Sequence, residues 1–294
     1  MATAYRPRRS MLYMPGSKPR ALEKAHGLAA DALILDLEDA VPPAEKDAAR
    51  DIVAEALTTG GYGARELIVR INGLDTDWGA ADLAMVAKSN ADAILIPKVE
   101  SKAMTQEVVA MLEAERASAD IAIWAMMETP LGILNALEIA QSHPKMAGMV
   151  MGTNDLVKEL QATHAPGRAP VSTSLSLCLL AARATGLACI DGVYNAFKDD
   201  EGLRAECTDG CARGFDGKTL IHPAQLAIAN ESFGPTEGAL AEAREQLAAF
   251  EAVEAAGQGV AVVNGRIVEN LHVETAKRLI AESEAIERLA ADTS

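Results

Sequence analysis

The chain has 294 residues, of which 49% are hydrophobic and 23% charged, and its formal net charge is −15. This composition supports a hydrophobic core of ordinary size, in one large domain or two small ones. The acidic balance argues against a nucleic-acid partner, and the lack of any run of about 18 apolar residues argues against a membrane partner. Four cysteines without a regular framework indicate a reducing compartment, so we expect a cytoplasmic protein.

The first residues reverse this charge balance. Within residues 1–24, the only acid is Glu23, and it stands against six basic side chains: Arg6, Arg8, Arg9, Lys18, Arg20 and Lys24. Such a segment is either a solvated tail or an anion site. The turn from Tyr13 to Lys18, which leads into a predicted helix, favours a phosphate site if the segment is folded into the domain.

Eight short apolar runs follow one another along the chain, and each is followed by a helical pattern. Their apolar residues are continuous and do not alternate, which predicts strands buried on both faces. The runs are Met11–Met14, Ala32–Leu37, Glu66–Ile71, Ala93–Ile96, Ile121–Met127, Met149–Met151, Ala188–Asp191 and Lys218–Ile221. Eight strand–helix units in roughly 250 residues predict an α/β fold of the (βα)8 TIM barrel type, with an open doubly wound sheet as the alternative.

The pattern changes after the eighth predicted strand. Residues 236–256 are rich in Ala and Glu and predict a helix, and the pair Asn264-Gly265 between two apolar runs predicts a hairpin. A last helix is predicted from His272 to Ala291. We therefore expect a barrel over residues 1–235 and a C-terminal helix–hairpin–helix extension over residues 236–294. The extension would be a lid over the barrel or an arm onto a neighbouring subunit.

Polar side chains collect at the carboxyl ends of the predicted strands, where barrel enzymes carry their active sites. Glu128 ends the fifth strand and Asp155 follows the sixth, so we expect the two carboxylates to lie close together. Oxygen ligands without a thiolate or histidine cluster suit Mg²⁺ or Mn²⁺ better than zinc, whereas each acid alone would be a strand-end cap or a surface residue. Asp36, Glu38 and Asp39 are placed to orient the water molecules of such an ion.

Two basic residues end the third and fourth strands. Arg70 faces the acids, so its guanidinium either stabilises an oxyanion or enolate or forms a buried salt bridge, and different ligand states allow both. Lys98 is interpreted as a structural ion pair in preference to a Schiff-base lysine. His222, held extended before Pro223, is interpreted as a core or rim histidine when its residue type alone is considered.

Six segments, taken in chain order, resemble one known family. They are Arg9-Ser-Met-Leu-Tyr-Met-Pro-Gly, Leu35-Asp-Leu-Glu-Asp-Ala, Val69-Arg-Ile-Asn, Ile96-Pro-Lys-Val-Glu, Met127-Glu-Thr and Gly217-Lys-Thr-Leu-Ile-His-Pro. Over about residues 9–290 the chain resembles the citrate lyase beta-subunit-like family, in the HpcH/HpaI aldolase superfamily of CoA-ester enzymes. The resemblance implies a (βα)8 barrel with a C-terminal extension, an acyl-CoA substrate and a homo-oligomer, either a trimer or a dimer of trimers.

The resemblance also implies roles for individual residues. Glu128 and Asp155 match the family's Mg²⁺ ligands, and Arg70 matches an arginine that contacts the substrate at the reacting carbon. The positions that match the contacts to CoA, which is part of the substrate, are Tyr13, Met14, Lys18, Lys24, Ile221 and His222. The amide of Asn154, beside one metal ligand, matches a further substrate contact.

Two branches of the family are similar to this sequence: one cleaves malyl-CoA to acetyl-CoA and glyoxylate, and the other hydrolyses (3S)-malyl-CoA to malate and CoA. The segments that resemble the hydrolytic branch are Trp124-Ala-Met-Met-Glu-Thr, Asp191-Gly-Val-Tyr-Asn-Ala-Phe, Glu201-Gly-Leu-Arg-Ala-Glu-Cys and Val268-Glu-Asn-Leu-His. Where the lyase branch carries an Asp, this sequence has Glu269, which we expect to act on water in a neighbouring subunit's site. A non-catalytic CoA-binding protein is the third alternative, and the acyl group (malyl, methylmalyl or citramalyl) stays open.

Overall fold

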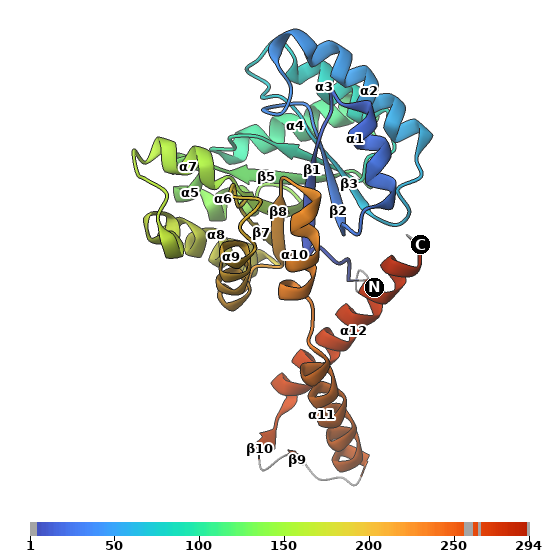
Figure 1. Cartoon of the computed structure of the whole chain (residues 1–294), viewed down its shortest axis with the longest axis vertical. Helices are drawn as coiled ribbons and strands as arrows, with labels where there is room; N and C mark the ends of the chain where they lie inside the picture. Colours follow the sequence, from blue (N-terminus) through green and yellow to red (C-terminus); the bar gives the residue numbers. More distant parts are fainter. Residues whose placement is uncertain (1–4, 256–260, 264–265, 293–294) are drawn as a thin grey trace. The chain divides into compact units, whose positions relative to one another are not determined.

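The computed structural model describes residues 5–255, 261–263 and 266–292. The chain divides into two compact units: residues 8–233, and residues 234–292 together with residues 5–7. The first unit is a closed barrel of eight parallel strands in the order β1 to β8, with helices around its outside (Figure 1). The predicted (βα)8 barrel is therefore confirmed, and the open doubly wound sheet is excluded.

The strands of the barrel agree closely with the predicted segments. They are β1 (Ser10–Pro15), β2 (Ala32–Asp36), β3 (Glu66–Arg70), β4 (Ala93–Ile96), β5 (Ala122–Met127), β6 (Met146–Met151), β7 (Ala188–Asp191) and β8 (Gly217–Leu220). Neighbouring strands pair in parallel, and the pairing of β1 with β8 closes the ring. Every predicted strand is present, and its bounds are within one residue of the prediction except at the start of β6.

Strand β6 begins earlier than predicted because Gly148 interrupts its apolar pattern. A Cβ atom on Gly148 would overlap the indole ring of Trp124 on β5, so only glycine leaves room for this ring. Trp124 is fully buried inside the barrel, where it packs with Met11 and Ile34. The glycine that weakens the sequence signal of the strand thus allows the barrel interior to be filled.

Helices and short 3₁₀ turns connect the strands. The helices are α1 (Pro19–Lys24), α2 (Lys46–Thr59), α3 (Gly79–Ala87), α4 (Lys102–Ala114), α5 (Pro130–Leu134), α6 (Ala136–Ala140), α7 (Thr153–Glu159), α8 (Ser172–Thr185), α9 (Asp200–Arg213) and α10 (Leu226–Phe233). The turns are η1 (Ala25–Gly27), η2 (Pro43–Glu45), η3 (Pro166–Val171) and η4 (Pro223–Gln225). On β2, Leu33 and Leu35 pack in one core with Val53 of α2, whereas Ile34 packs inside the barrel. Burial on both faces explains the continuous apolar runs.

The second unit contains α11 (Glu237–Ala255), the antiparallel hairpin of β9 (Ala261–Val263) and β10 (Arg266–Val268), and α12 (Asn270–Asp292). Val263, Val268 and Val273 form a small core of their own with Phe250 of α11. These elements confirm the predicted helix–hairpin–helix, although its turn pair, residues 264–265, lies outside the described residues. The role of the extension as a lid or an arm stays a prediction. None of the described helices has the length and apolar character that a bilayer span requires.

Candidate active site

A cavity of about 350 Å³ opens at the carboxyl ends of the barrel strands. The predicted catalytic, metal and substrate residues that line it are Tyr13, Asp36, Arg70, Glu128, Asn154, Asp155 and Ile221, and Asp39 lines it as well. The apolar part of the cavity wall includes Met126, Met151 and Val193. The topology of the barrel therefore brings together side chains from distant positions along the chain, as expected for the carboxyl rim of a (βα)8 fold.

The two predicted metal ligands, Glu128 and Asp155, belong to this cavity. Glu128 follows β5 directly, and Asp155 lies in the first turn of α7, just after β6. Glu128 is 1% exposed, and its Oε1 accepts a hydrogen bond from the backbone N–H of Lys98 at 2.8 Å. Within the described part of the chain, no hydrogen bond or ion pair reaches the Asp155 carboxylate, and no group of three His, Cys, Asp or Glu side chains is arranged to hold a metal.

Gly152 gives Glu128 the room it needs. A Cβ atom on Gly152 would overlap both Cβ and Oε2 of Glu128. The carboxylate of Glu128 is therefore fixed with Oε1 on the Lys98 amide and Oε2 beside Gly152. Sequence reasoning did not single out this glycine, and its only signal was its place between β6 and Asp155.

The electrostatic environment of Glu128 fits a bound cation. Burial, together with the negative charge of Glu38, raises the pKa of Glu128 to about 7, and the Lys98 amide, Arg70 and Lys98 oppose the rise only in part. Burying an ionised carboxylate with so few compensating interactions costs free energy unless a cation binds beside it. Two carboxylates that leave positions for water and substrate are the oxygen donor set that Mg²⁺ prefers. The residues present therefore fit Mg²⁺.

Arg70 forms the buried salt bridge that was one of its two predicted roles. Its Nε and Nη2 donate to the two oxygens of Asp36 at 2.7 and 2.6 Å. Its Nη1 donates to Oδ2 of Asp39 at 3.4 Å and lies 2.9 Å from Oε2 of Glu38, an ion pair without hydrogen-bond geometry. Burial alone would lower the pKa of Arg70, but the carboxylates, Asp36 foremost, raise it well above its ordinary value. Arg70 is thus permanently charged and lies over the ring of Tyr13 at 4.9 Å.

Asp36, Glu38 and Lys98 complete the charged cluster. Asp36 also accepts hydrogen bonds from the backbone N–H groups of Glu38 and Ala40, so it anchors the loop that follows β2. Lys98 Nζ donates to Oε1 of Glu38 at 2.7 Å, which confirms the predicted ion pair. The hydrogen bond to Glu38 raises the pKa of Lys98 to about 12 although burial opposes it. That Asp36 and Glu38 orient metal-bound water stays a prediction.

The residues matched to CoA contacts are not all brought to the cavity. Tyr13 and Ile221 line it, but the side chain of Met14 is 5% exposed and packs in the core between barrel and helices. Lys18 and Lys24 are exposed and follow β1 without lining the cavity. Any contact of Met14 with a ligand would therefore have to come from its backbone.

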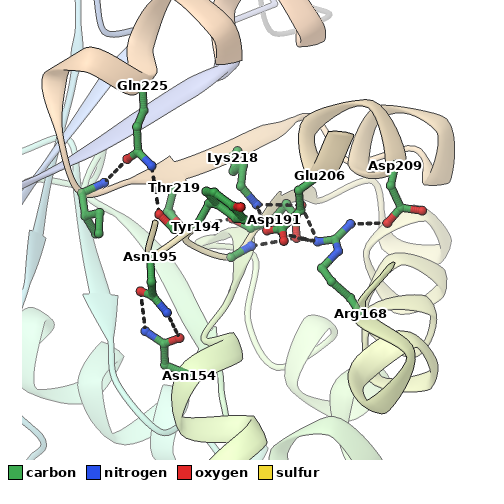
Figure 2. A network of polar contacts seen from close by, with 12 residues as sticks. Asn154, Arg168, Asp191, Tyr194, Asn195, Glu206, Asp209, Lys218, Thr219 and Gln225 are labelled. Atoms are coloured by element: carbon green, nitrogen blue, oxygen red, sulfur yellow. Dashed lines mark hydrogen bonds and ion pairs between the residues drawn. The ribbon is translucent and has the colours of Figure 1, made fainter. Parts of the chain in front are cut away.

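His222 is an exposed residue that starts η4. Its Nδ1 accepts a hydrogen bond from the N–H of Ala224 at 3.1 Å, and its ring stacks on Phe197 with centroids 4.6 Å apart. Gln225 accepts the N–H groups of Ile221 and His222 and donates to the carbonyl of Tyr194 (Figure 2). His222 therefore belongs to the rim, as its residue type alone suggested.

The basic segment does not form one anion site. Arg8 pairs with Glu66 and Arg9 pairs with Asp31, both at the amino end of the strands, opposite to the cavity. Lys18, Arg20 and Lys24 follow the carboxyl end of β1, so strand β1 separates the two groups of charges. The predicted concentration of positive charge is therefore wrong, and only the second group remains for a phosphate.

A second cavity of about 670 Å³ adjoins the first, and the two share Thr153 and Val193 as walls. Asn154 of the first cavity and Asn195 of the second exchange two side-chain hydrogen bonds, at 2.7 and 3.2 Å (Figure 2). This amide pair fixes the side chain of the residue that precedes Asp155.

A buried ion network lies beside the second cavity, between β7, β8, α9 and η3 (Figure 2). Its ion pairs are Arg168–Asp191 at 2.6 Å, Lys218–Asp191 at 3.1 Å, Lys218–Glu206 at 2.6 Å, Arg213–Asp209 at 2.9 Å and Arg168–Asp209. Sequence reasoning missed Arg168, which lies in a segment rich in Pro and Gly.

Glu269 lies in the unit formed by residues 234–292. Its side chain is exposed, its N–H donates to Nδ1 of His272 at 3.0 Å, and its carbonyl accepts the first hydrogen bonds of α12. Its predicted action in a neighbouring subunit's site stays a prediction.

The fold agrees with the comparisons to known proteins. The chain belongs to the HpcH/HpaI aldolase/citrate lyase family, whose model matches residues 9–223. The resemblance found in the sequence is therefore confirmed.

Individual relatives extend this similarity over nearly the whole chain. A (3S)-malyl-CoA thioesterase of Cereibacter sphaeroides (strain ATCC 17025 / ATH 2.4.3) is 59% identical over 286 residues, which cover 97% of this chain and 98% of that protein. An L-malyl-CoA/beta-methylmalyl-CoA lyase of the same strain is 37% identical, with 96% of each chain covered. The crystal structure of CitE from Mycobacterium tuberculosis in complex with magnesium, acetoacetate and coenzyme A is 32% identical with a TM-score of 0.75, and the match covers 94% of this chain and 97% of that one.

Proposed function

We propose that this protein is a Mg²⁺-dependent hydrolase of (3S)-malyl-CoA that releases malate and CoA. The observation that carries the proposal is the 59% identity to the thioesterase over nearly the full length of both chains, against 37% to the lyase. The acidic cavity supports it, because it offers two carboxylates for a metal and a charged arginine beside them.

Glu128 and Asp155 would hold the Mg²⁺ ion, or Mn²⁺ in its place. When bound, the ion supplies positive charge that polarises and orients substrate oxygens. The other catalytic roles belong to side chains of the protein itself. Arg70, held by its fork on Asp36, stabilises the oxyanion that develops at the thioester carbonyl. Glu269 of a neighbouring subunit acts as general base on the attacking water.

The remaining contacts in the proposal belong to CoA and to the assembly. Tyr13, Ile221 and the amide of Asn154 contact the substrate near the reacting group, and His222 contacts it at the rim. Lys18 and Lys24 provide cations for the phosphates, with Met14 contributing backbone only. A homo-oligomer, either a trimer or a dimer of trimers, and a cytoplasmic location belong to the same proposal, and the four free cysteines support the location.

Product analysis tests the reaction. The protein is incubated with (3S)-malyl-CoA and Mg²⁺, and the products are separated and identified. We expect malate together with CoA that carries a free thiol. Acetyl-CoA together with glyoxylate would establish the lyase reaction instead, and binding without turnover would establish a non-catalytic CoA-ester-binding protein. A panel with methylmalyl-CoA and citramalyl-CoA ranks the acyl groups, which differ by a methyl group worth about 1–3 kcal/mol.

A further inference from the structure

Lys98 has a backbone conformation that side chains seldom adopt. Its φ is 48°, in the left-handed region that favours glycine. It lies just after β4, at the carboxyl rim of the barrel. Strain of this kind persists only where the surrounding structure requires it, and such residues gather at functional sites.

The unusual backbone lets Lys98 make two separate contacts in the charged cluster. Its N–H donates to Oε1 of Glu128 at 2.8 Å, and its Nζ donates to Oε1 of Glu38 at 2.7 Å. One residue therefore contacts a proposed metal ligand with its backbone and the acid beside Arg70 with its side chain.

The side-chain contact controls how Glu38 meets Arg70. Oε1 of Glu38 is bonded to Lys98, while Oε2 lies 2.9 Å from Nη1 of Arg70 without a hydrogen bond. Nε and Nη2 of Arg70 are already used by Asp36, and Nη1 donates one long hydrogen bond to Asp39 at 3.4 Å. Without the ammonium of Lys98, Glu38 would lose the side-chain donor that bonds its Oε1. It would then turn to accept the second N–H of Nη1, the one left for an oxyanion.

We infer that Lys98 is a positioning residue of this site: its amide fixes the Glu128 carboxylate, and its ammonium holds Glu38 so that the second N–H of Nη1 of Arg70 stays available. The inference rests on the proposed function, because it assigns Arg70 to the substrate and Glu128 to the metal. The backbone role and the side-chain role are separable by mutation, since every residue except proline retains the N–H.

Three substitutions separate the two roles. Lys98→Met keeps the length of the side chain and removes its charge, Lys98→Gly also relieves the left-handed backbone, and Lys98→Arg keeps the charge. We expect Lys98→Met and Lys98→Gly to lower kcat for malyl-CoA on the order of 10-fold. Their affinity for Mn²⁺ without substrate should equal or exceed the wild-type value, because the amide remains and the cluster becomes more negative. Lys98→Arg should recover most of kcat.

The measurements are Mn²⁺ titration followed by electron paramagnetic resonance and steady-state kinetics, with thermal melting to show that each variant is folded. Lys102→Met is the matched control, because Lys102 is exposed at the start of α4 and does not line the cavity. It should match the wild type in both assays.

Two results would overturn the inference. One is a wild-type kcat in Lys98→Met. The other is a joint loss of Mn²⁺ binding and kcat in folded Lys98→Met and Lys98→Gly, because the side chain would then belong to the metal site itself. A wild-type protein that turns over no malyl-CoA would remove the proposed function and the inference together, whereas an active wild type matched by Lys98→Met would remove the inference alone.

Discussion

The barrel unit contains two clusters of buried charge, and they differ in balance. The network beside β7 and β8 pairs three cations with three carboxylates: Arg168, Lys218 and Arg213 with Asp191, Glu206 and Asp209. Among the described residues, the cluster at the cavity has three cations, Arg70, Lys98 and the buried Lys46, whose Nζ donates to the carbonyl of Glu38. It has five carboxylates, of which Asp39 is exposed: Asp36, Glu38, Asp39, Glu128 and Asp155.

From this difference in charge balance we expect the network beside β7 and β8 to stabilise the fold and the cluster at the cavity to take part in the reaction. Buried charges are tolerated when each has a partner, so a neutral network can connect elements and fix their positions without any ligand. In the cavity cluster, no cationic side chain among the described residues forms an ion pair with Glu128 or Asp155, so we expect an added cation to complete the cluster. Substitutions in the network beside β7 and β8 should therefore lower stability with little effect on turnover, whereas substitutions in the cluster at the cavity should lower turnover with little effect on stability.

The largest expected effect is that of Glu128→Gln, which removes a carboxylate from the unbalanced cluster. We expect hydrolysis of malyl-CoA to fall at least about a thousandfold, or about 4 kcal/mol, because one of two metal ligands is lost. The free energy of unfolding of the metal-free protein should not fall, since burial already raises the pKa of Glu128 to about 7. Thiol release and urea unfolding measure the two quantities, with exposed Glu55→Gln as the control. Turnover within tenfold of the wild type would contradict the metal role.

In the balanced network, Arg168→Met should show the opposite signature. The substitution leaves Asp191 and Asp209 with one cationic partner each, so the free energy of unfolding should fall by about 3 kcal/mol. Arg168 does not line the smaller cavity, so turnover per folded molecule should change little. Arg116→Met is the matched control, because Arg116 has nearly the same φ, 57° against 56°, and is exposed. Equal urea midpoints for the two variants would show that the network contributes no stability.

Arg70→Lys sharpens the comparison within the cavity cluster. The substitution keeps the positive charge but loses the fork that holds Asp36 and the nitrogen offered to the oxyanion. We expect kcat to fall about 100-fold, which is about 2.7 kcal/mol, with Mn²⁺ affinity close to that of the wild type. Unchanged turnover of malyl-CoA in the lysine variant would remove Arg70 from the chemistry.

The smallest expected effect is a difference in acid stability at Asp209. Partial burial would raise the pKa of Asp209, but hydrogen bonds from Arg213 and Arg168 outweigh burial and lower it. Stability from these bonds is present above the ordinary aspartate pKa of about 3.9 and is lost as pH falls through the lower value of the folded state. The wild type should therefore exceed Asp209→Asn in stability at neutral pH by less than about 1 kcal/mol, since the group is partly exposed. Unfolding curves from pH 7 to pH 3 should show this gap close, and a constant gap would contradict the assignment.

The sequence predicted the features that depend on local patterns and on barrel topology. Continuous apolar runs marked the strands, and the rule that strand ends converge placed Glu128 and Asp155 at the same cavity. The interpretation of the basic segment failed, because residues that are close along the chain lie at opposite ends of a strand. Arg8 and Lys18 are close in sequence, but a six-residue strand of roughly 20 Å lies between their ends of the barrel.

Other contacts in the barrel unit could not be predicted, because the partners are distant in sequence or the backbone conformation is unusual. Arg168 binds an acid that lies 23 residues further along, and no local pattern announces that contact. Lys98 was interpreted as an ion pair, but its left-handed backbone and its amide bond to Glu128 depend on the loop that only the folded barrel defines.

Gly152 shows how the proposed metal site depends on the absence of a side chain. The space a methyl group would fill is occupied by the carboxylate of Glu128, and the Lys98 amide holds that carboxylate from its other oxygen. An alanine at this position would push a ligand out of place while every acid of the sequence stayed intact. In a relative of this protein that keeps both carboxylates but lacks this glycine, the acid that corresponds to Glu128 would therefore be displaced from the position proposed for metal binding.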